Sequence, residues 1–121
     1  MTSILWVAAG GAVGSTLRYL ATSSLKYFFP SLPIGTLIVN IFGSFVIGFL
    51  MSYMESKNIS YNIIKYFFII GILGSFTTFS AFSSEVIDLI NNKKILFSLF
   101  YIFISLTTCL FFCYLGYNLN K

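Results

Sequence analysis

The chain has 121 residues, of which 58% are hydrophobic and only 8% are charged. Soluble domains carry about 25% charged residues, so this composition excludes an ordinary soluble domain and indicates an integral membrane protein. The net charge is +4, but the basic residues stand singly or in one pair rather than in a block. That scatter is typical of interface anchors and argues against nucleic-acid binding.

The first apolar stretch covers residues 4–25 and is long enough to cross a bilayer, which takes about 20 residues. No basic residue precedes it and no small-residue cleavage site follows a short apolar run, so we expect a retained helix rather than a secretory signal. Arg18 lies near the end of this stretch. Its long side chain can snorkel to the interface, or it can hold a fixed positive charge at a vestibule.

The second apolar stretch, residues 34–54, carries Asn40 near its centre. An amide at that depth both donates and accepts hydrogen bonds, and it serves either as a contact between helices or as part of a binding site. Thr36 and Ser44 lie one helical turn to either side and share its face. These three side chains predict a polar track along the helix.

The third apolar stretch, residues 63–90, contains the segment 71–83, with five hydroxyl side chains, two glycines and three phenylalanines. Polar groups at bilayer depth are tolerated only where they pack against protein or line a watery path. This segment is therefore the first candidate for the functional site. Glu85 and Asp88 follow one turn apart, but no third ligand or nucleophile accompanies them, so we expect no enzyme.

The fourth apolar stretch, residues 95–117, places Tyr101, Ser105 and Cys109 at successive i, i+4 positions on one face. These side chains predict a second ladder of hydrogen-bond donors that faces the Asn40 track. The alternative is that the hydroxyls bond back to the carbonyl four residues earlier. Cys109 and Cys113 indicate neither a disulfide framework nor a metal site, because the chain has no histidine.

Assembly is suggested by the charge pattern. The four stretches leave no room for a soluble domain, so we expect one transmembrane domain over residues 1–121. One side of the membrane then takes Lys57, Lys65 and Lys121, and the other takes Arg18, Lys26, Lys93 and Lys94. The positive-inside rule needs a bias to choose an orientation, so we hypothesise a dual-topology protein whose oppositely inserted copies pair. The alternative is one orientation set by a few weak charges and other determinants.

Two pairs of small residues stand four apart, Gly10 with Gly14 and Ser44 with Gly48. Such spacings let membrane helices approach closely. They predict either packing between helices of one subunit or a seam between two copies.

Four blocks of the sequence, in order, resemble the Fluc (CrcB) family of fluoride channels. They are residues 10–19, 35–48, 71–82 and the pair Tyr101 and Ser105. The resemblance implies an all-α membrane protein with four transmembrane helices per subunit, a broken third helix and an antiparallel homodimer. It also implies two narrow pores that let cytoplasmic fluoride leave through the cell inner membrane down its electrochemical gradient, which reduces fluoride toxicity.

The resemblance also carries residue roles onto this chain. The pore phenylalanines match Phe79 and Phe82, the pore asparagine matches Asn40, and further hydrogen-bond donors match Thr36, Tyr101 and Ser105, with Ser80 as an added candidate. Arg18 and Glu85 match supporting positions. Where the family often has another serine or threonine, this chain has Cys109, and a thiol donates only a weak hydrogen bond.

A structural sodium ion at the dimer centre is a further implication of the resemblance. By motif position, the backbone carbonyls of Gly74 and Thr77 from each copy would hold it. A broken helix exposes carbonyls that its own ladder no longer uses, and such groups favour a cation.

Other classes of membrane protein stay open. A small dual-topology, proton-coupled multidrug exporter has a similar length, but it would need a carboxylate in the first stretch, which has none. A proton-coupled fluoride or cation transporter would show flux that depends on a proton gradient. A purely structural subunit would conduct no ion, and it would have no reason to place Asn40 and the hydroxyl-rich segment so deep.

Overall fold

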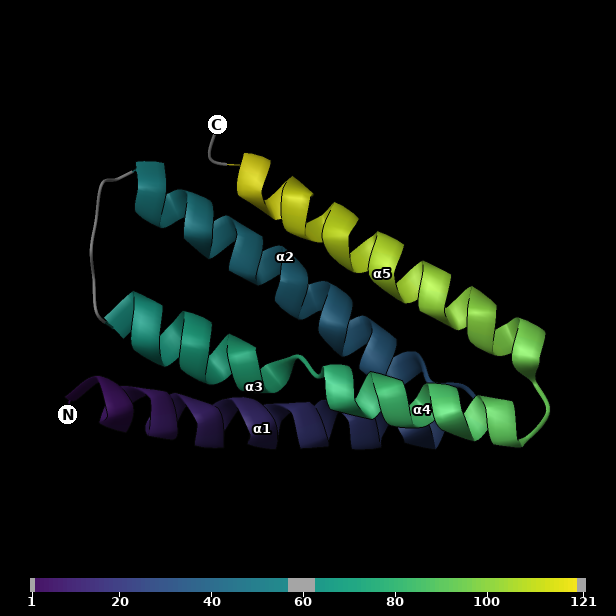
Figure 1. Ribbon diagram of the computed structural model, residues 1–121. Helices are drawn as coiled ribbons and strands as arrows, with labels where there is room; N and C mark the ends of the chain where they lie inside the picture. Colours follow the sequence, from purple (N-terminus) through teal and green to yellow (C-terminus); the bar gives the residue numbers. More distant parts are fainter. Residues whose placement is uncertain (1, 57–62, 120–121) are drawn as a thin grey trace.

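The computed structural model describes residues 2–56 and 63–119, and every regular element within them is a helix. In chain order these are α1 (Thr2–Phe28), α2 (Ile34–Ser56), η1 (Ile63–Leu73), α3 (Gly74–Phe76), α4 (Phe79–Asn91) and α5 (Ile95–Asn118) (Figure 1). Four stretches are long and apolar enough to cross a membrane, and the third is residues 63–91, which combines η1, α3 and α4. The prediction of an all-helical protein with four membrane-length apolar helices is confirmed. Lys57 and Lys121 of the charge comparison lie outside the described residues.

The bundle is built on two closely packed pairs, α1 with η1 and α2 with α5 (Figure 1). Glycines permit the close approach of the backbones. A Cβ on Gly14 would collide with the backbone of Ile72 in η1, and a Cβ on Gly48 would collide with the carbonyl of Cys113 in α5. In this structure the small-residue spacings therefore serve packing within the subunit, which is the first of the two alternatives.

The third membrane-length stretch changes conformation in its middle. α3 ends at Phe76, Thr77 and Thr78 have extended backbone with ψ of 154° and 116°, and α4 begins at Phe79. β-Branched threonines suit extended backbone better than helix. Thr78 then caps α4, because its Oγ1 accepts a hydrogen bond from the backbone N–H of Ala81 at 3.0 Å. Hydrogen-bonding groups are thus concentrated halfway along an apolar segment.

Little of the chain is buried against itself. A small cluster of buried apolar side chains joins α4 to α5 and consists of Phe82, Leu89 and Tyr101. Most other large apolar side chains, including those along α1 and α5, are exposed at the surface of the bundle. Such a surface is stable when lipid acyl chains, rather than water, cover it. The fold is that of a multi-pass membrane protein.

Candidate functional site

Asn40 on α2 holds the extended junction between α3 and α4. Its Nδ2 donates to the carbonyl oxygen of Thr78 at 3.1 Å, and its Oδ1 accepts from the backbone N–H of Thr78 at 2.8 Å. A residue outside a helix needs partners for both backbone groups where water is scarce, and Asn40 supplies both. Because Nδ2 carries two hydrogens, one of them is left to serve a second acceptor. Asn40 is therefore a contact between helices and also a candidate donor.

A cavity of about 270 Å³ lies beside this junction, between α2, α4 and α5. Its wall consists of Asn40, Ser44, Thr77, Thr78, Phe79, Phe82, Ser105, Leu106, Cys109 and Leu110. Four of the predicted pore residues are thus brought together from three separate apolar stretches, namely Asn40, Phe79, Phe82 and Ser105. The mixture of a few polar groups with apolar walls is typical of a small-ligand site.

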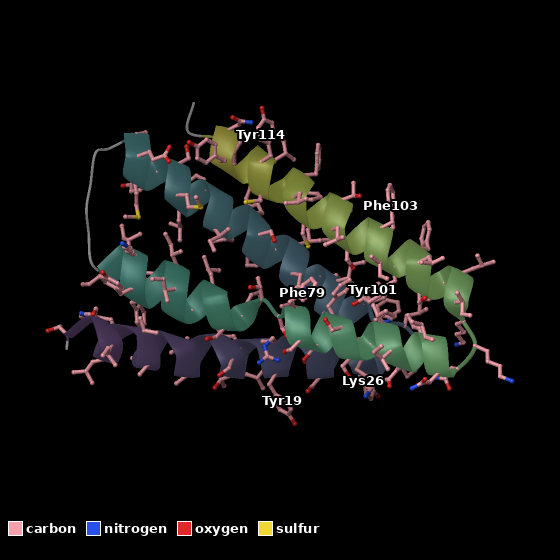
Figure 2. The ribbon with its side chains drawn as sticks, in the orientation of Figure 1. Tyr19, Lys26, Phe79, Tyr101, Phe103 and Tyr114 are labelled. Atoms are coloured by element: carbon pink, nitrogen blue, oxygen red, sulfur yellow. The ribbon has the colours of Figure 1, made fainter. Side chains whose placement is uncertain are left out.

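Three aromatic rings form a row next to this cavity. The ring centroids are 5.1 Å apart for Phe79 and Phe82 and 5.2 Å apart for Phe82 and Tyr101, and each pair is tilted by 50°. Figure 2 shows Phe79 and Tyr101 in the space between α4 and the α2–α5 pair. Phe82 is buried, whereas Phe79 is 68% exposed. Phe79 therefore meets lipid or another protein surface on its outer side.

Ser105 is the one buried side chain of the described part of the chain whose polar atom makes no hydrogen bond. It is only 5% exposed. Leaving a buried hydroxyl unpaired costs about 1–3 kcal/mol. Since Ser105 lines the 270 Å³ cavity, a polar occupant of that cavity would remove the cost. Back-bonding to the helix, the alternative for membrane hydroxyls, is what Thr108 does, with Oγ1 donating to the carbonyl of Ile104 at 2.6 Å.

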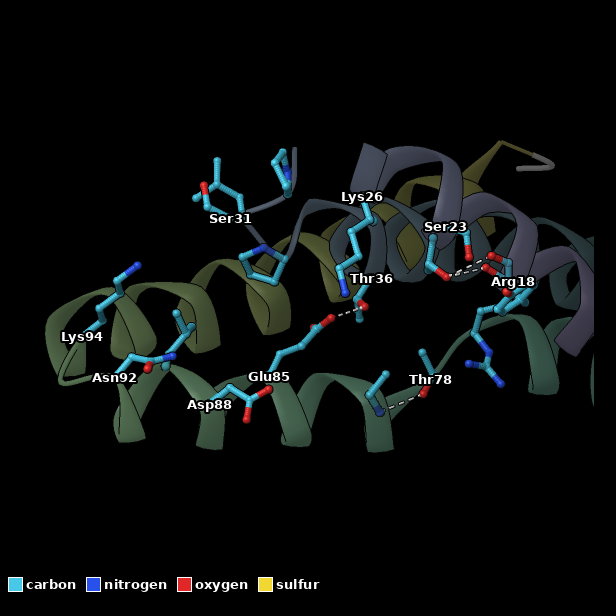
Figure 3. A pocket seen from close by; sticks show the side chains of 18 residues that line it. Arg18, Ser23, Lys26, Ser31, Thr36, Thr78, Glu85, Asp88, Asn92 and Lys94 are labelled. Carbon is cyan, nitrogen blue, oxygen red and sulfur yellow. Dashed lines mark hydrogen bonds between the residues drawn. The ribbon is translucent and has the colours of Figure 1, made fainter. Parts of the chain in front are cut away.

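Glu85 connects α4 to α2 and α5 through two hydroxyl groups. Its carboxylate accepts from Thr36 Oγ1 at 2.7 Å and from the hydroxyl of Tyr101 at 2.6 Å. Figure 3 shows the first of these bonds. Both hydroxyl protons therefore point at Glu85 in this structure. The group links the aromatic row, which Tyr101 ends, to a second cavity, which Thr36 and Glu85 line.

This second cavity, of about 620 Å³, lies between α1, α2 and α4 (Figure 3). Its wall carries charges of both signs, from Arg18, Lys26, Asp88 and Lys94 besides Glu85. Such a lining is suited to water and ions rather than to lipid. The Nε of Arg18 donates to the carbonyl oxygen of Ser75 at 3.0 Å. Arg18 therefore stabilises the end of α3 and also contributes charge to this second cavity, which we call the vestibule.

Gly74 and Thr77 present carbonyls that have lost their α-helical donors. In an α-helix these carbonyls would accept from the backbone N–H groups of Thr78 and Ala81, four residues later. Those N–H groups donate instead to Asn40 Oδ1 and to Thr78 Oγ1. Within residues 2–56 and 63–119, no cluster of three Cys, Asp or Glu side chains could hold a metal ion.

Of the predicted pore residues, Ser80 and Tyr101 line neither cavity, and Thr36 lines only the second cavity. The Oγ of Ser80 shares a hydrogen bond with Thr78 Oγ1 at 3.2 Å, and Ser80 is exposed. Thr78, to which sequence analysis gave no role, is the more central residue because it pairs with Asn40, caps α4 and lines both cavities. The sequence held one indication of this role, because a threonine just before a helix can cap it by accepting from the N–H three residues later, here that of Ala81.

Comparison with known proteins adds an independent finding. The family model described as "CrcB-like protein, Camphor Resistance (CrcB)" matches residues 5–117. A Flavobacterium psychrophilum protein named "Fluoride-specific ion channel FluC" is 42% identical over 106 residues, which cover 87% of this chain and 86% of that protein. Proteins of the same name from Campylobacter jejuni and Campylobacter fetus are 39% and 42% identical over 122 residues. These matches cover 100% and 99% of this chain, and 99% and 94% of the relatives. The chain therefore belongs to the CrcB-like family, as its sequence blocks predict.

Proposed function

We propose that this protein is a fluoride channel, which lets fluoride leave the cytoplasm through the cell inner membrane and so limits fluoride toxicity. The observation that carries the proposal is the 270 Å³ cavity, where Asn40, the phenylalanine pair and the unpaired hydroxyl of Ser105 meet. Relatives named "Fluoride-specific ion channel FluC" along the whole chain support the same ion. The protein acts by passive conduction and not as an enzyme.

The cavity suits fluoride because of how this ion is hydrated. Fluoride is small and strongly hydrated, so a selective pore has to replace its water with short hydrogen bonds while still letting it leave. Ser105 Oγ–H and the second hydrogen of Asn40 Nδ2 are two donors on the cavity wall, which Ser44 also lines. The edges of Phe79 and Phe82 add weak positive charge to the cavity wall. Chloride, which is larger and less strongly hydrated, gains less from the same short hydrogen bonds.

Thr36 and Tyr101 complete the path between the cavity and the vestibule. Each hydroxyl has a single proton, which it donates in a hydrogen bond either to Glu85 or to a passing ion. Because each hydroxyl can change its hydrogen-bond acceptor from the carboxylate to fluoride and back, fluoride is held weakly at each step, which conduction requires. Glu85 and Arg18 act as supporting residues, since they orient the hydroxyls and hold the end of α3.

The proposed working unit is an antiparallel, dual-topology homodimer of single-domain subunits, in which the third membrane span works as a broken helix at Thr77 and Thr78. Four helices can hardly enclose an ion path alone. The outer face of α4 exposes Phe79 together with Ser80 and Ser83, and hydroxyls at bilayer depth need protein or water beside them. A second copy on this face would cover them, and Ser80 would then lie at the subunit contact.

The carbonyls of Gly74 and Thr77 fit a structural sodium ion at the centre of such a dimer. Sodium prefers hard oxygen ligands, and both carbonyls have lost their α-helical donors to Asn40 and Thr78. Bound there, sodium would supply positive charge that compensates the carbonyl dipoles of two neighbouring copies. Asn40 and Arg18 support this arrangement, because they hydrogen-bond to the backbone on either side of the junction.

The test is fluoride efflux from liposomes that contain the purified protein, followed with a fluoride electrode and compared with chloride efflux. We expect fluoride to leave without a proton gradient, which separates a channel from a proton-coupled exporter. Phe79→Ile and Phe82→Ile should abolish the flux, whereas Phe111→Ile, on the exposed side of α5, should preserve it. Vesicles that retain fluoride as well as protein-free vesicles would refute the proposed function.

A further inference from the structure

Cys109 stands in the wall of the 270 Å³ cavity. It is a free, half-buried thiol on α5, one turn beyond Ser105 on the same helix face, and Ser44 lines the cavity from α2. The wall residues on that side are otherwise apolar or hydroxyl-bearing. Cys109 is therefore the one nucleophilic sulfur on this wall.

A second observation shows that this space is suited to a solute. Ser105 Oγ is buried, lines the same cavity and has no hydrogen-bond partner. Dry packing does not leave a buried hydroxyl in that condition, because polar groups inside proteins are almost always paired. A polar occupant, water or an ion, satisfies Ser105. Because Cys109 lies one turn from Ser105 on the same wall, an occupant bound to Ser105 lies close to Cys109.

We propose that Cys109 is a thiol-modification site in the wall of the ion path. Small neutral sulfur electrophiles enter the path, react with Cys109 and block conduction. The effect on flux rests on the proposed channel function, whereas the modification itself does not. A thiol adduct at this position projects into the space of about 270 Å³ that Phe79 and Phe82 also line. An ion that needs close contact with the wall cannot pass such an adduct.

Methyl methanethiosulfonate is a suitable probe, since it is small and uncharged. The sulfur of Cys109 attacks the methylthio sulfur of the reagent and forms a new S–S bond. The bond between that sulfur and the sulfonyl sulfur breaks, methanesulfinate leaves with the electron pair, and the thiol proton goes to water. Dithiothreitol reverses the step, because its two thiols reduce the mixed disulfide and close to a cyclic disulfide.

Cys113 provides a matched control on the same helix. It is one turn further along α5, also a free and half-buried thiol, but it is not part of the cavity wall. Its backbone carbonyl lies against Gly48 of α2, within the closely packed α2–α5 pair. Modification of Cys113 should leave the ion path open.

The experiment treats the wild-type protein in liposomes with the reagent and measures fluoride efflux together with peptide masses. We expect a disulfide adduct at Cys109 and a fall in flux of about tenfold or more, restored by dithiothreitol. Cys113→Ser should behave like the wild type, and Cys109→Ser should conduct fluoride and resist the reagent. Cys109→Ala serves as a second resistant variant if the serine form is poorly folded.

Several outcomes would contradict the assignment of Cys109 as a modification site in the ion path. An unmodified Cys109 after long exposure contradicts it, as does a modified Cys109 with unchanged flux. Equal block of the Cys109→Ser variant would assign the effect to Cys113. Absence of fluoride flux before treatment would instead refute the proposed function, and the peptide masses would still report whether Cys109 reacts in preference to Cys113.

Discussion

The two glycine-packed helix pairs and the region around α4 are built in opposite ways. In the α1–η1 and α2–α5 pairs, backbones touch and glycines leave no space for a side chain. Around α4, contacts are made by side-chain hydrogen bonds such as those of Glu85 and Asn40, and two cavities lie beside them. Close packing of the two pairs thus stabilises the bundle, and the less closely packed region around α4 holds the polar side chains and the cavities.

The largest expected effect comes from disturbing a packed pair. Gly48→Leu should prevent folding, because even a Cβ at this position collides with the carbonyl of Cys113 in α5, and overpacking by one or two methylenes alone costs about 1–3 kcal/mol. Size-exclusion chromatography in detergent should show aggregated protein. Gly74→Ala is the control, since its Cβ would meet only Ile69 O at 3.6 Å. A well-folded Gly48→Leu protein would contradict the importance of this close approach.

The next largest effect should come from the junction that α2 and α4 share. Asn40→Asp keeps the shape of the side chain but replaces the donor to the carbonyl of Thr78 by an oxygen. Two acceptors then face each other, and we expect fluoride flux to vanish and stability to fall by about 1–3 kcal/mol. Asn91→Asp, at the end of α4 on an exposed position, should change neither. Flux and thermal unfolding in detergent are measured on both.

Two buried serines of α5 separate stability from conduction. Ser105→Ala removes an unpaired hydroxyl, so stability should stay level or rise by about 1 kcal/mol while fluoride flux falls about tenfold. Ser98→Ala removes a hydroxyl that donates to the carbonyl of Ile95 at 2.7 Å. It should lose about 1 kcal/mol of stability and keep its flux. The same response from both variants would deny Ser105 a special role.

The smallest effect is expected at the far end of the α2–α5 pair. There the hydroxyl of Tyr117 donates to the carboxylate of Glu55 at an exposed position. Exposed interactions of this kind contribute less than about 1 kcal/mol. Tyr117→Phe should therefore lower the melting temperature only slightly and leave fluoride flux unchanged. A loss of flux would show that this end of the bundle also controls conduction.

The four helices and the family could be predicted from the sequence because long apolar runs and short motifs are local features. The partners of polar side chains could not. Asn40 and Thr78 are 38 residues apart, and nothing in their spacing shows that one amide would satisfy both backbone groups of the other. Periodicity placed Tyr101 and Ser105 on one face, but only the fold shows that Tyr101 donates to Glu85 whereas Ser105 stays unpaired.

The double hydrogen bond from Asn40 has a consequence for motion in the membrane. A side-chain amide has the same donor and acceptor as a peptide unit, so α2 lends the third span a substitute for the missing turn of its own helix. The bend at Thr78 is thereby a property of two helices rather than of a flexible hinge. A tilt of α2 would therefore act directly on Thr78, a residue that lines both cavities.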